Sequence, residues 1–191
     1  MGRPRKFEEE RAVQAAMLAF WADGYEATST QELCEATGLG RSSIYNTFAS
    51  KRDLYVKALA HYMHHRTGRL AELMEDGAKP VREKLRTVLE WAVEPDAGDP
   101  AGCLVVNATV ELGPHDPDIA ERLDRDRRRR FELLKSGIED GIRTGELDRD
   151  RDAAALTHFV IATVSGIQVA ARGGADRATL RSIADTAMNS I

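Results

Sequence analysis

Polar side chains in residues 41–48 surround two apolar ones. Ile44 and Phe48 are four residues apart, so they share one face of a predicted short helix. The outward side chains are Arg41, Ser42, Ser43, Tyr45 and Asn46. Guanidinium and amide groups pair with base edges, and hydroxyl groups bind phosphates. The spacing therefore predicts a helix that packs by one face and presents nucleic-acid-binding groups on the other.

A second predicted helix must hold this one in place. It covers residues 29–37, and Ser29 can cap it, with Glu32 completing a capping box. The glycines in residues 38–40 allow a tight turn, because glycine tolerates positive φ. Two short helices joined by such a turn form a helix-turn-helix, which fits the major groove of double-stranded DNA. We therefore expect DNA as the partner.

Charge supports DNA binding only through the placement of basic residues. The chain has 191 residues, of which 42% are hydrophobic, and a net charge of −4. Opposite charges balance over residues 1–57, so the excess acidity belongs to residues 58–191, a body that we do not expect to contact DNA. Basic side chains nevertheless flank and begin the two short helices: Arg3, Arg5, Lys6, Arg41, Lys51 and Arg52.

The composition also indicates a compartment. Cys34 and Cys103 are far apart and lack metal-type spacing, so we expect a reducing cytoplasm and no disulfide framework. The N-terminus has no apolar signal core, and the longest mostly apolar run, residues 159–171, is too short to span a bilayer. No nucleophile–base pair, glycine-rich phosphate loop or strong metal motif stands out. We expect no membrane association, no cofactor, no metal site and no enzymatic activity.

Helical periodicity runs through nearly the whole chain and predicts an all-α fold. The first helix has an apolar face and ends at Gly24; the face comprises Val13, Ala16, Met17, Phe20 and Trp21. Later helices are expected over residues 51–75, 81–93, 103–112, 118–145, 152–171 and 176–191, with a loop over 94–102. We expect a DNA-binding domain over 1–50 and a second domain over 51–191, with helix 51–75 connecting the two.

The last two predicted helices are candidates for a homodimer interface. The first of them carries small side chains that allow close helix approach: Ala153, Ala154, Ala155, Ala162, Gly166 and Ala170. The second carries an apolar stripe: Leu180, Ile183, Ala184, Ala187 and Met188. Helix-turn-helix proteins usually bind two-fold sites, which favours a dimer. The alternative is that both helices form the core of the subunit.

Residues 7–62 resemble the TetR family of transcriptional repressors. The resemblance is carried, at family spacing, by Gly24-Tyr25, Thr28-Ser29-Thr30, Leu33-Cys34, Gly38-Leu39, Ile44-Tyr45, Phe48 and Lys51. Two positions depart from the family pattern: Gly40 replaces a frequent Ser, and Thr47 replaces a frequent His. The resemblance implies an all-α homodimer, in which each subunit has a DNA-binding head and a larger body that holds a small-molecule effector.

The resemblance also implies roles for individual side chains in the head. The expected phosphate contacts come from Ser29, Thr30, Tyr45 and Lys51, and the Thr47 hydroxyl could add another. The expected base contacts come from Gln31, Arg41, Ser42 and Asn46. Ser43 lies on the same outward face. The basic arm with Arg3 and Arg5 would enter the adjacent minor groove. The alternatives are that Tyr45 closes the core of the head, that Arg41 is merely solvated, and that the arm is idle.

A polar line on the predicted helix 103–112 suggests an effector cavity. Cys103, Asn107 and Glu111 recur at i, i+4 and i+8 inside an otherwise apolar helix. Candidate walls elsewhere in the body are Trp91, Phe131, His158 and Phe159. The alternative is a buried hydrogen-bond network without a ligand. The segment 102–112 also resembles a TetR subgroup whose members respond to small or reactive compounds.

Three further groups of residues have both a chemical and a plain interpretation. Cys103 follows a glycine at a predicted helix start, which favours a reactive thiolate, yet it could also be a small core residue like Cys34. His61, His64 and His65 could share a metal ion, but no fourth ligand is evident. The basic run 127–130 is mixed with acidic residues and is typical of a solvated helix face.

These expectations combine into one functional hypothesis. The chain is expected to be a one-component, ligand-responsive repressor that binds a pseudo-palindromic operator as a dimer. Its two recognition helices would enter successive major grooves about 34 Å apart, until an effector favours a state that no longer matches this spacing. The alternative is a repressor that senses oxidants or electrophiles through Cys103.

Overall fold

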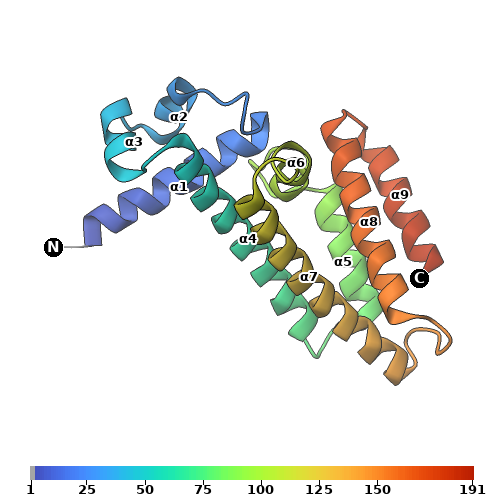
Figure 1. Ribbon diagram of the computed structural model, residues 1–191. Coiled ribbons are helices and arrows are strands. Elements are labelled where there is room, and N and C mark those ends of the chain that lie inside the picture. The colour runs from blue at the N-terminus through green and yellow to red at the C-terminus, as the bar shows by residue number, and fades with distance from the viewer. Residues whose placement is uncertain (1–2) are drawn as a thin grey trace.

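The computed structural model describes residues 3–191, with side chains described from Glu9 onward. Within this range the chain is entirely helical apart from its loops, which confirms the all-α fold (Figure 1). The elements are α1 (Arg3–Asp23), α2 (Thr30–Thr37), α3 (Arg41–Thr47), α4 (Lys51–Glu75), α5 (Val81–Val93), α6 (Leu104–Glu111), α7 (Pro117–Thr144), α8 (Ala153–Arg172) and α9 (Arg177–Ser190).

Local capping signals set the helix boundaries. The Ser29 side chain accepts from the Glu32 amide, and Glu32 returns the bond to the Ser29 amide, so the predicted capping box is present. Gly38 ends α2 in the left-handed region with φ +69°, as the glycine turn requires. Asp116 caps α7, where Pro117 follows it in the first turn.

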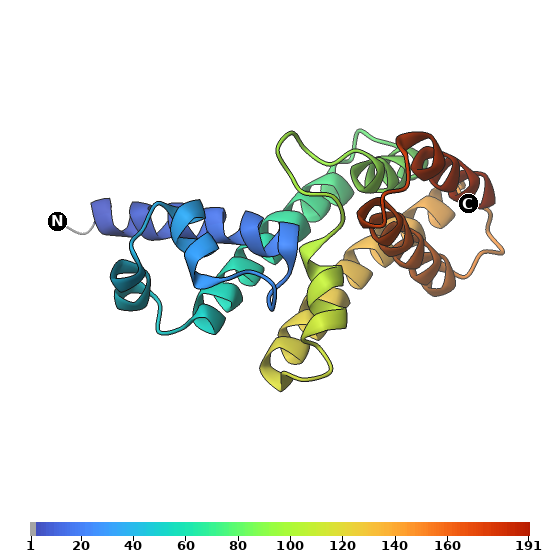
Figure 2. The same cartoon turned by 90° about the horizontal axis from the view of Figure 1, so that it is seen from above.

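The head consists of α1–α3 packed on the first half of α4 (Figure 2). Aromatic rings join α1 to α4: the Phe20 and Tyr55 ring centroids are 5.0 Å apart, as are those of Trp21 and Tyr62. The same apolar cluster continues into α6 and the start of α7 through Leu104, Ala108, Leu112, Ile119 and Leu123. A domain division at residue 50 stays a prediction, because this core crosses that point.

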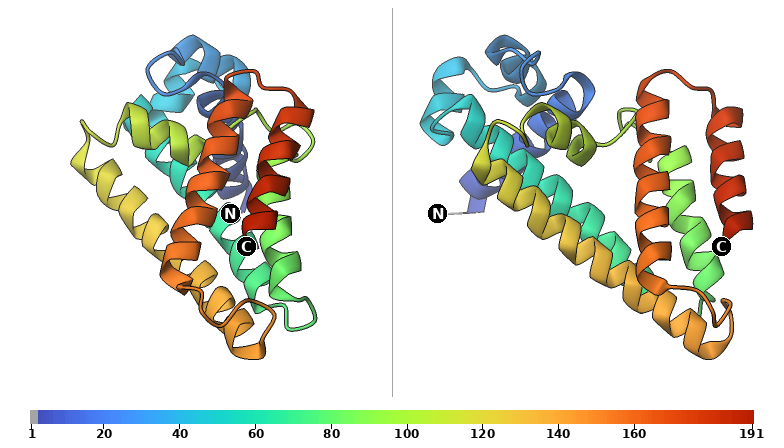
Figure 3. Two further views of the ribbon diagram at one scale, coloured as in Figure 1. Left: turned by 90° about the vertical axis from the view of Figure 1, so that its right-hand side faces the viewer. Right: turned by 45° about the vertical axis from the view of Figure 1, so that its right-hand side comes forward.

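The body consists of two layers of helices (Figure 3). Helices α4 and α7 lie side by side in one layer, and α5, α8 and α9 form the other. A second apolar cluster fills the space between the layers, with Leu85, Ile138, Val160 and Ile167 fully or almost fully buried. Helix α6 contacts α1, α4, α7 and α8, and therefore lies between the head and the body.

Helices α8 and α9 use their apolar residues differently from the expectation. On α9, Leu180, Ala184, Ala187 and Met188 are buried within the subunit, and Ile183 alone of the predicted stripe is exposed. The predicted stripe therefore mainly forms subunit core, because α9 packs that face on α5 and α8. On α8, a row of exposed small and apolar residues remains, which we call the α8 stripe: Ala155, Phe159, Ala162, Gly166 and Val169.

The apolar segment of α8 is longer than the run seen in the sequence. The helix has 20 residues, and an 18-residue window within it has a mean hydropathy of 1.5, which by length and composition alone would suffice to cross a membrane. The run 159–171, too short by itself, is part of this longer apolar helix. Its inner face packs on α5, α7 and α9, as in the core of a helical bundle.

Candidate nucleic-acid interface and effector cavity

Helix α3 presents the polar face that its sequence predicts. Ile44 is 1% exposed and Phe48 is fully buried, and both anchor the helix on the head. The side chains on the other side are exposed: Arg41, Ser42, Ser43, Tyr45, Asn46 and Thr47. Tyr45 is 43% exposed and therefore does not close the core of the head. The Arg41 guanidinium lies 6.0 Å from its ring centroid, so the two side chains form one surface.

Helix α2 begins beside this surface. The Thr30 hydroxyl lies 3.4 Å from the Tyr45 hydroxyl, so the start of α2 and the outer face of α3 meet. Gln31 is exposed and donates to Glu35 at 3.0 Å. The Ser29 hydroxyl accepts from the Glu32 amide in the helix cap, and its own proton remains available to a further acceptor, as does that of Thr30. Phosphate contacts by these two residues stay predictions.

Lys51 lies where α4 begins. Its Nζ lies 4.6 Å from the Tyr25 ring centroid and donates to the Glu26 carbonyl oxygen at 3.4 Å. The amine is therefore held near the loop that leads into α2. Arg3 and Arg5 are in the first turn of α1 and do not form an extended arm. Their side chains lie outside the described residues, so the minor-groove contact stays a prediction.

Helix α6 fastens the body to the head through its polar face. The Glu111 carboxylate accepts from the backbone amides of Tyr25 at 2.9 Å and Glu26 at 2.7 Å. The Asn107 side-chain amide donates to the Trp21 carbonyl oxygen at 3.4 Å, and Arg172 of α8 donates to the same oxygen at 3.0 Å. The end of α1 and the turn after it thus occupy the polar groups of Asn107 and Glu111, which line an open pocket against α8 and not the cavity inside the body. An effector contact by these two residues stays a prediction.

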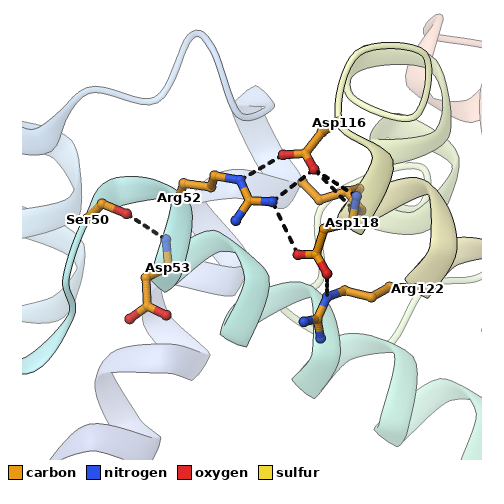
Figure 4. Close-up of polar contacts among 7 residues, drawn as sticks. Ser50, Arg52, Asp53, Asp116, Asp118 and Arg122 are labelled. Atoms are coloured by element: carbon orange, nitrogen blue, oxygen red, sulfur yellow. Dashed lines mark hydrogen bonds and ion pairs between the residues drawn. The ribbon is translucent and has the colours of Figure 1, made fainter.

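Arg52 makes a second connection between head and body (Figure 4). Its guanidinium donates to both oxygens of Asp116, at 2.7 and 2.8 Å, and to Asp118 at 3.2 Å. The bond from Arg52, helped by backbone amides at the start of α7, lowers the pKa of Asp116 to about 2. The start of α4 is thereby tied to the start of α7 by a bidentate ion pair.

A cavity of about 250 Å³ lies inside the body. Its walls come mainly from helices α4, α5, α7 and α8 and from the segment before α6. Trp91 and Cys103 line it, as predicted. Five polar residues that the sequence does not single out also line it: Tyr62, Arg66, Asp126, Arg130 and Gln168. These charged and amide residues occur on amphipathic helices, where the sequence gives no sign of which ones turn inward.

Three predicted cavity residues lie on the outer surface instead. The Phe131 ring of α7 and the His158 ring of α8 have centroids 4.7 Å apart, and neither residue lines the cavity. Phe159 is 41% exposed and belongs to the α8 stripe. On α8, Ile161, Val164 and Gln168 face the cavity in place of His158 and Phe159. A role of Phe131, His158 and Phe159 in effector binding stays a prediction.

Cys103 is the N-cap residue of α6 and is 6% exposed. The Tyr62 hydroxyl donates to its Sγ at 3.3 Å. Burial, with the neighbouring Cys103 adding to the effect, raises the pKa of Tyr62 far above neutral pH, so this hydroxyl stays protonated and remains a donor. The thiol therefore belongs at once to the cavity wall and to the start of the helix that holds the head.

The histidines and the basic run have surface positions. His61, His64 and His65 are exposed on α4, and residues 3–191 contain no group of three His, Cys, Asp or Glu side chains arranged to hold a metal ion. In the basic run, Arg127 and Arg128 pair with Asp124, and Arg130 pairs with Asp126. The run is thus largely a solvated helix face, with Arg130 turned into the cavity wall.

The fold and the exposed α3 face define a helix-turn-helix DNA-binding regulator, and comparison with known proteins supplies its family. Residues 77–187 match the tetracyclin repressor-like C-terminal domain, and residues 12–58 match the bacterial regulatory proteins of the tetR family. The chain belongs to the TetR family of transcriptional regulators.

Relatives of this chain match it along most of their length. The repressor BdcR of Escherichia coli (strain K12) is 31% identical over 91% of this chain and 83% of its own. The repressor ComR of the same strain is 29% identical over 98% of this chain and 90% of its own. The structure of a cysteine-substituted TetR-family regulator CifR, complexed with 26 bp operator DNA, has a TM-score of 0.83 and 32% identity, and the match covers 98% of each chain.

We predict that the Arg52–Asp116 contact is visible in the titration of Asp116. Because the pKa of Asp116 is lowered in the folded protein, its contribution to stability is fully present above about pH 4 and is lost as the pH falls through about 2. Arg52→Gln should raise the pKa of Asp116 by about one unit or more, measured by NMR titration of the side-chain carboxyl. Arg125→Gln is the matched control, since Arg125 pairs with Glu121. An unchanged pKa in Arg52→Gln would show that the α7 amides alone set it.

Proposed function

We propose that the protein is a one-component transcriptional repressor of the cytoplasm, which binds a pseudo-palindromic operator as a homodimer and is released by a small-molecule effector. The observation that carries the proposal is the outer face of α3, whose hydrogen-bonding side chains are exposed while Ile44 and Phe48 fix the helix. CifR, a relative with 32% identity, is complexed with operator DNA. That complex supports operator DNA as the ligand of this protein.

The side chains of the head would make two kinds of contact with DNA, one to phosphates and one to base edges. Thr30, Tyr45 and Lys51 surround the start of α2 and the outer face of α3, where phosphates would meet hydroxyl and amine donors. Arg41 can pair bidentately with guanine, while Asn46 and Gln31 suit adenine. Ser42, Ser43 and Thr47 complete the exposed surface. The phosphate contacts position the head, and the base contacts select the operator.

The α8 stripe supports dimerisation through the last two helices. It is a continuous exposed row of small and apolar side chains, and Ile183 of α9 adds an exposed apolar side chain. Rows of small residues allow two helices to approach closely, and a two-fold axis pairs each row with its own copy. A dimer formed in this way would present two α3 helices to the two halves of one operator.

The cavity supports control by a small molecule. Its walls combine apolar side chains with a few polar groups, as ligand sites do, and its volume of about 250 Å³ favours a small effector. Helix α6 begins at the cavity with Cys103 and ends at the head with Glu111. A ligand that shifts α6 would therefore shift the head. A coupling of about 1–3 kcal/mol would change operator affinity roughly 5–150-fold.

The experiment that tests this function is footprinting of the purified protein on the DNA upstream of its own gene, at near-physiological salt. A short protected palindrome is expected. If this DNA shows none, binding sites selected from random DNA decide the question. Failure to select any sequence preference would contradict an operator-specific repressor.

Two substitutions should separate base reading from phosphate binding. Arg41→Ala should relax the preference at one base position by about 1–3 kcal/mol. Tyr45→Phe keeps the ring and removes only the hydroxyl, so it should weaken binding on all sequences alike. Competition binding assays with single-base operator variants measure both effects. An unchanged base preference in Arg41→Ala would show that another side chain reads that position.

A thiol switch is the second candidate function, and the position of Cys103 favours it. The thiol lines the cavity and accepts a hydrogen bond from Tyr62, and Cys103 is the N-cap residue of the helix that holds the head, although its side chain makes no capping bond. Modification of this sulfur by an oxidant or electrophile would add atoms at the start of α6.

We predict that Cys103→Ser separates the two mechanisms. In a ligand-gated repressor, the variant should bind the operator and still be released by the effector, because serine keeps the size and the hydrogen-bonding capacity of the residue. Cys34→Ser is the control for general thiol chemistry, since Cys34 is partly buried in the head. Loss of release in Cys103→Ser alone would instead establish the thiol switch.

A further inference from the structure

An acidic loop neutralises two arginines at one side of the cavity. We define this acidic loop as residues 94–102, between α5 and α6. Arg66 of α4 donates to Asp99 at 2.7 Å and lies 3.7 Å from Asp96. Arg69 donates to the same Asp96 at 2.7 Å and stacks on Trp91, with its guanidinium 4.1 Å from the ring centroid. The loop carboxylates therefore occupy arginine donors beside the cavity wall, to which Arg66 and Trp91 belong.

A third guanidinium comes from α7, which lies beside α4 in the same layer. Arg130 of α7 lines the cavity, and its Nε is buried without a well-aligned acceptor, although the Asp126 carboxylate is 2.8 Å away. The other Asp126 oxygen accepts from the Thr67 hydroxyl at 2.7 Å. The wall thus contains two guanidinium groups and one carboxylate, and it has more hydrogen-bond donors than acceptors.

Apart from Tyr62, Cys103 and Gln168, the remainder of the wall is mostly apolar. Val88, Val105, Leu134, Ile161 and Val164 face the same space, together with the Trp91 ring. A ligand that fills it must therefore have an apolar body. A cationic end would meet two guanidinium groups, and a purely apolar ligand would offer no acceptor to the donors of the wall. An anionic end would be paired on burial, as buried charges require.

We propose that the cavity binds a small amphiphile with a carboxylate or similar anionic end, and that this anion pairs with Arg66 in place of Asp99. The inference rests on the proposed ligand-responsive function and names the chemical class of the effector. The acidic loop acts as an internal competitor, since its Asp99 carboxylate holds the guanidinium that the ligand needs. The apolar body of the ligand lies among the aliphatic side chains, and Arg130 supplies a further donor.

Arg66 also connects this recognition to the head. Its guanidinium lies 5.3 Å from the ring centroid of Trp21, at the end of α1, and 5.5 Å from that of Tyr62. An anion that draws Arg66 toward the cavity changes its contact with Trp21, whose carbonyl oxygen is the acceptor for Asn107 and Arg172. The Arg66 side chain would thus contact both the ligand and the head.

The test is isothermal titration calorimetry, without DNA, of three probes that share one apolar body: 4-phenylbutyrate, 4-phenylbutanamide and 4-phenylbutylamine. The carboxylate should bind about tenfold or more tightly than the amide, and the amine most weakly. Arg66→Met should weaken carboxylate binding about tenfold or more and leave amide binding nearly unchanged. Asp99→Asn should strengthen carboxylate binding, because it removes the competing charge while keeping the size of the side chain.

Controls separate this inference from folding and from the proposed function. Arg125→Met removes an exposed arginine of α7 that does not line the cavity, so its binding should match the parent protein. Melting curves check the fold of Arg66→Met, and Asp99→Asn gives an independent result of opposite sign. Equal or tighter binding of the amide or amine, absence of binding by all three, or no effect of Asp99→Asn would each overturn the inference. Footprinting would still decide separately whether the protein is an operator-specific repressor.

Discussion

The orientation of the DNA-facing helix depends on the packing of α1 against the first half of α4. Helices α2 and α3 have eight and seven residues, which is too short for stability of their own. They are held by a core in which Phe20 packs edge-on against Tyr55, and Trp21 against Tyr62. Helix α4 is continuous over 25 residues, and its far half packs in the second apolar cluster, so one helix joins the core of the head to the core of the body. Head and body are therefore parts of one packed structure.

Polar contacts then fix the angle at which the two parts meet. The Glu111 carboxylate holds two successive amides of the head, and Arg52 ties the start of α4 to the start of α7. Both contacts are partly exposed to solvent, so each is worth less than a buried contact and can exchange with water. The apolar core contributes most of the stability, while these contacts fix the position of the head on the body.

Helix boundaries could be predicted from the sequence because local chemistry sets them. Ser29 with Glu32, Gly38 and Pro117 act on their immediate neighbours, and the structure has each of them at a helix end. The exposed face of α3 could be predicted for the same reason, since Ile44 and Phe48 leave the helix only one way to pack.

The cavity could not be predicted in this way. Periodicity showed that Asn107 and Glu111 share a polar face, but the partner of that face is the end of α1, more than 80 residues away in the chain. Arg66 and Arg130 resemble any other arginine on an amphipathic helix, and only the packing of α4 and α7 brings them to one space. Contacts between distant segments decide which polar side chains turn inward.

The fit between Gly24 and Glu111 has a consequence for how this chain can vary. Gly24 has φ +91°, and a β-carbon there would lie 3.1 Å from the Glu111 carboxylate. A side chain at position 24 would strain the backbone and force the Glu111 carboxylate to shift from its place against the two amides that it holds. Relatives that lose the glycine should therefore also lose the glutamate, and these two positions, far apart in the chain, should change together in evolution.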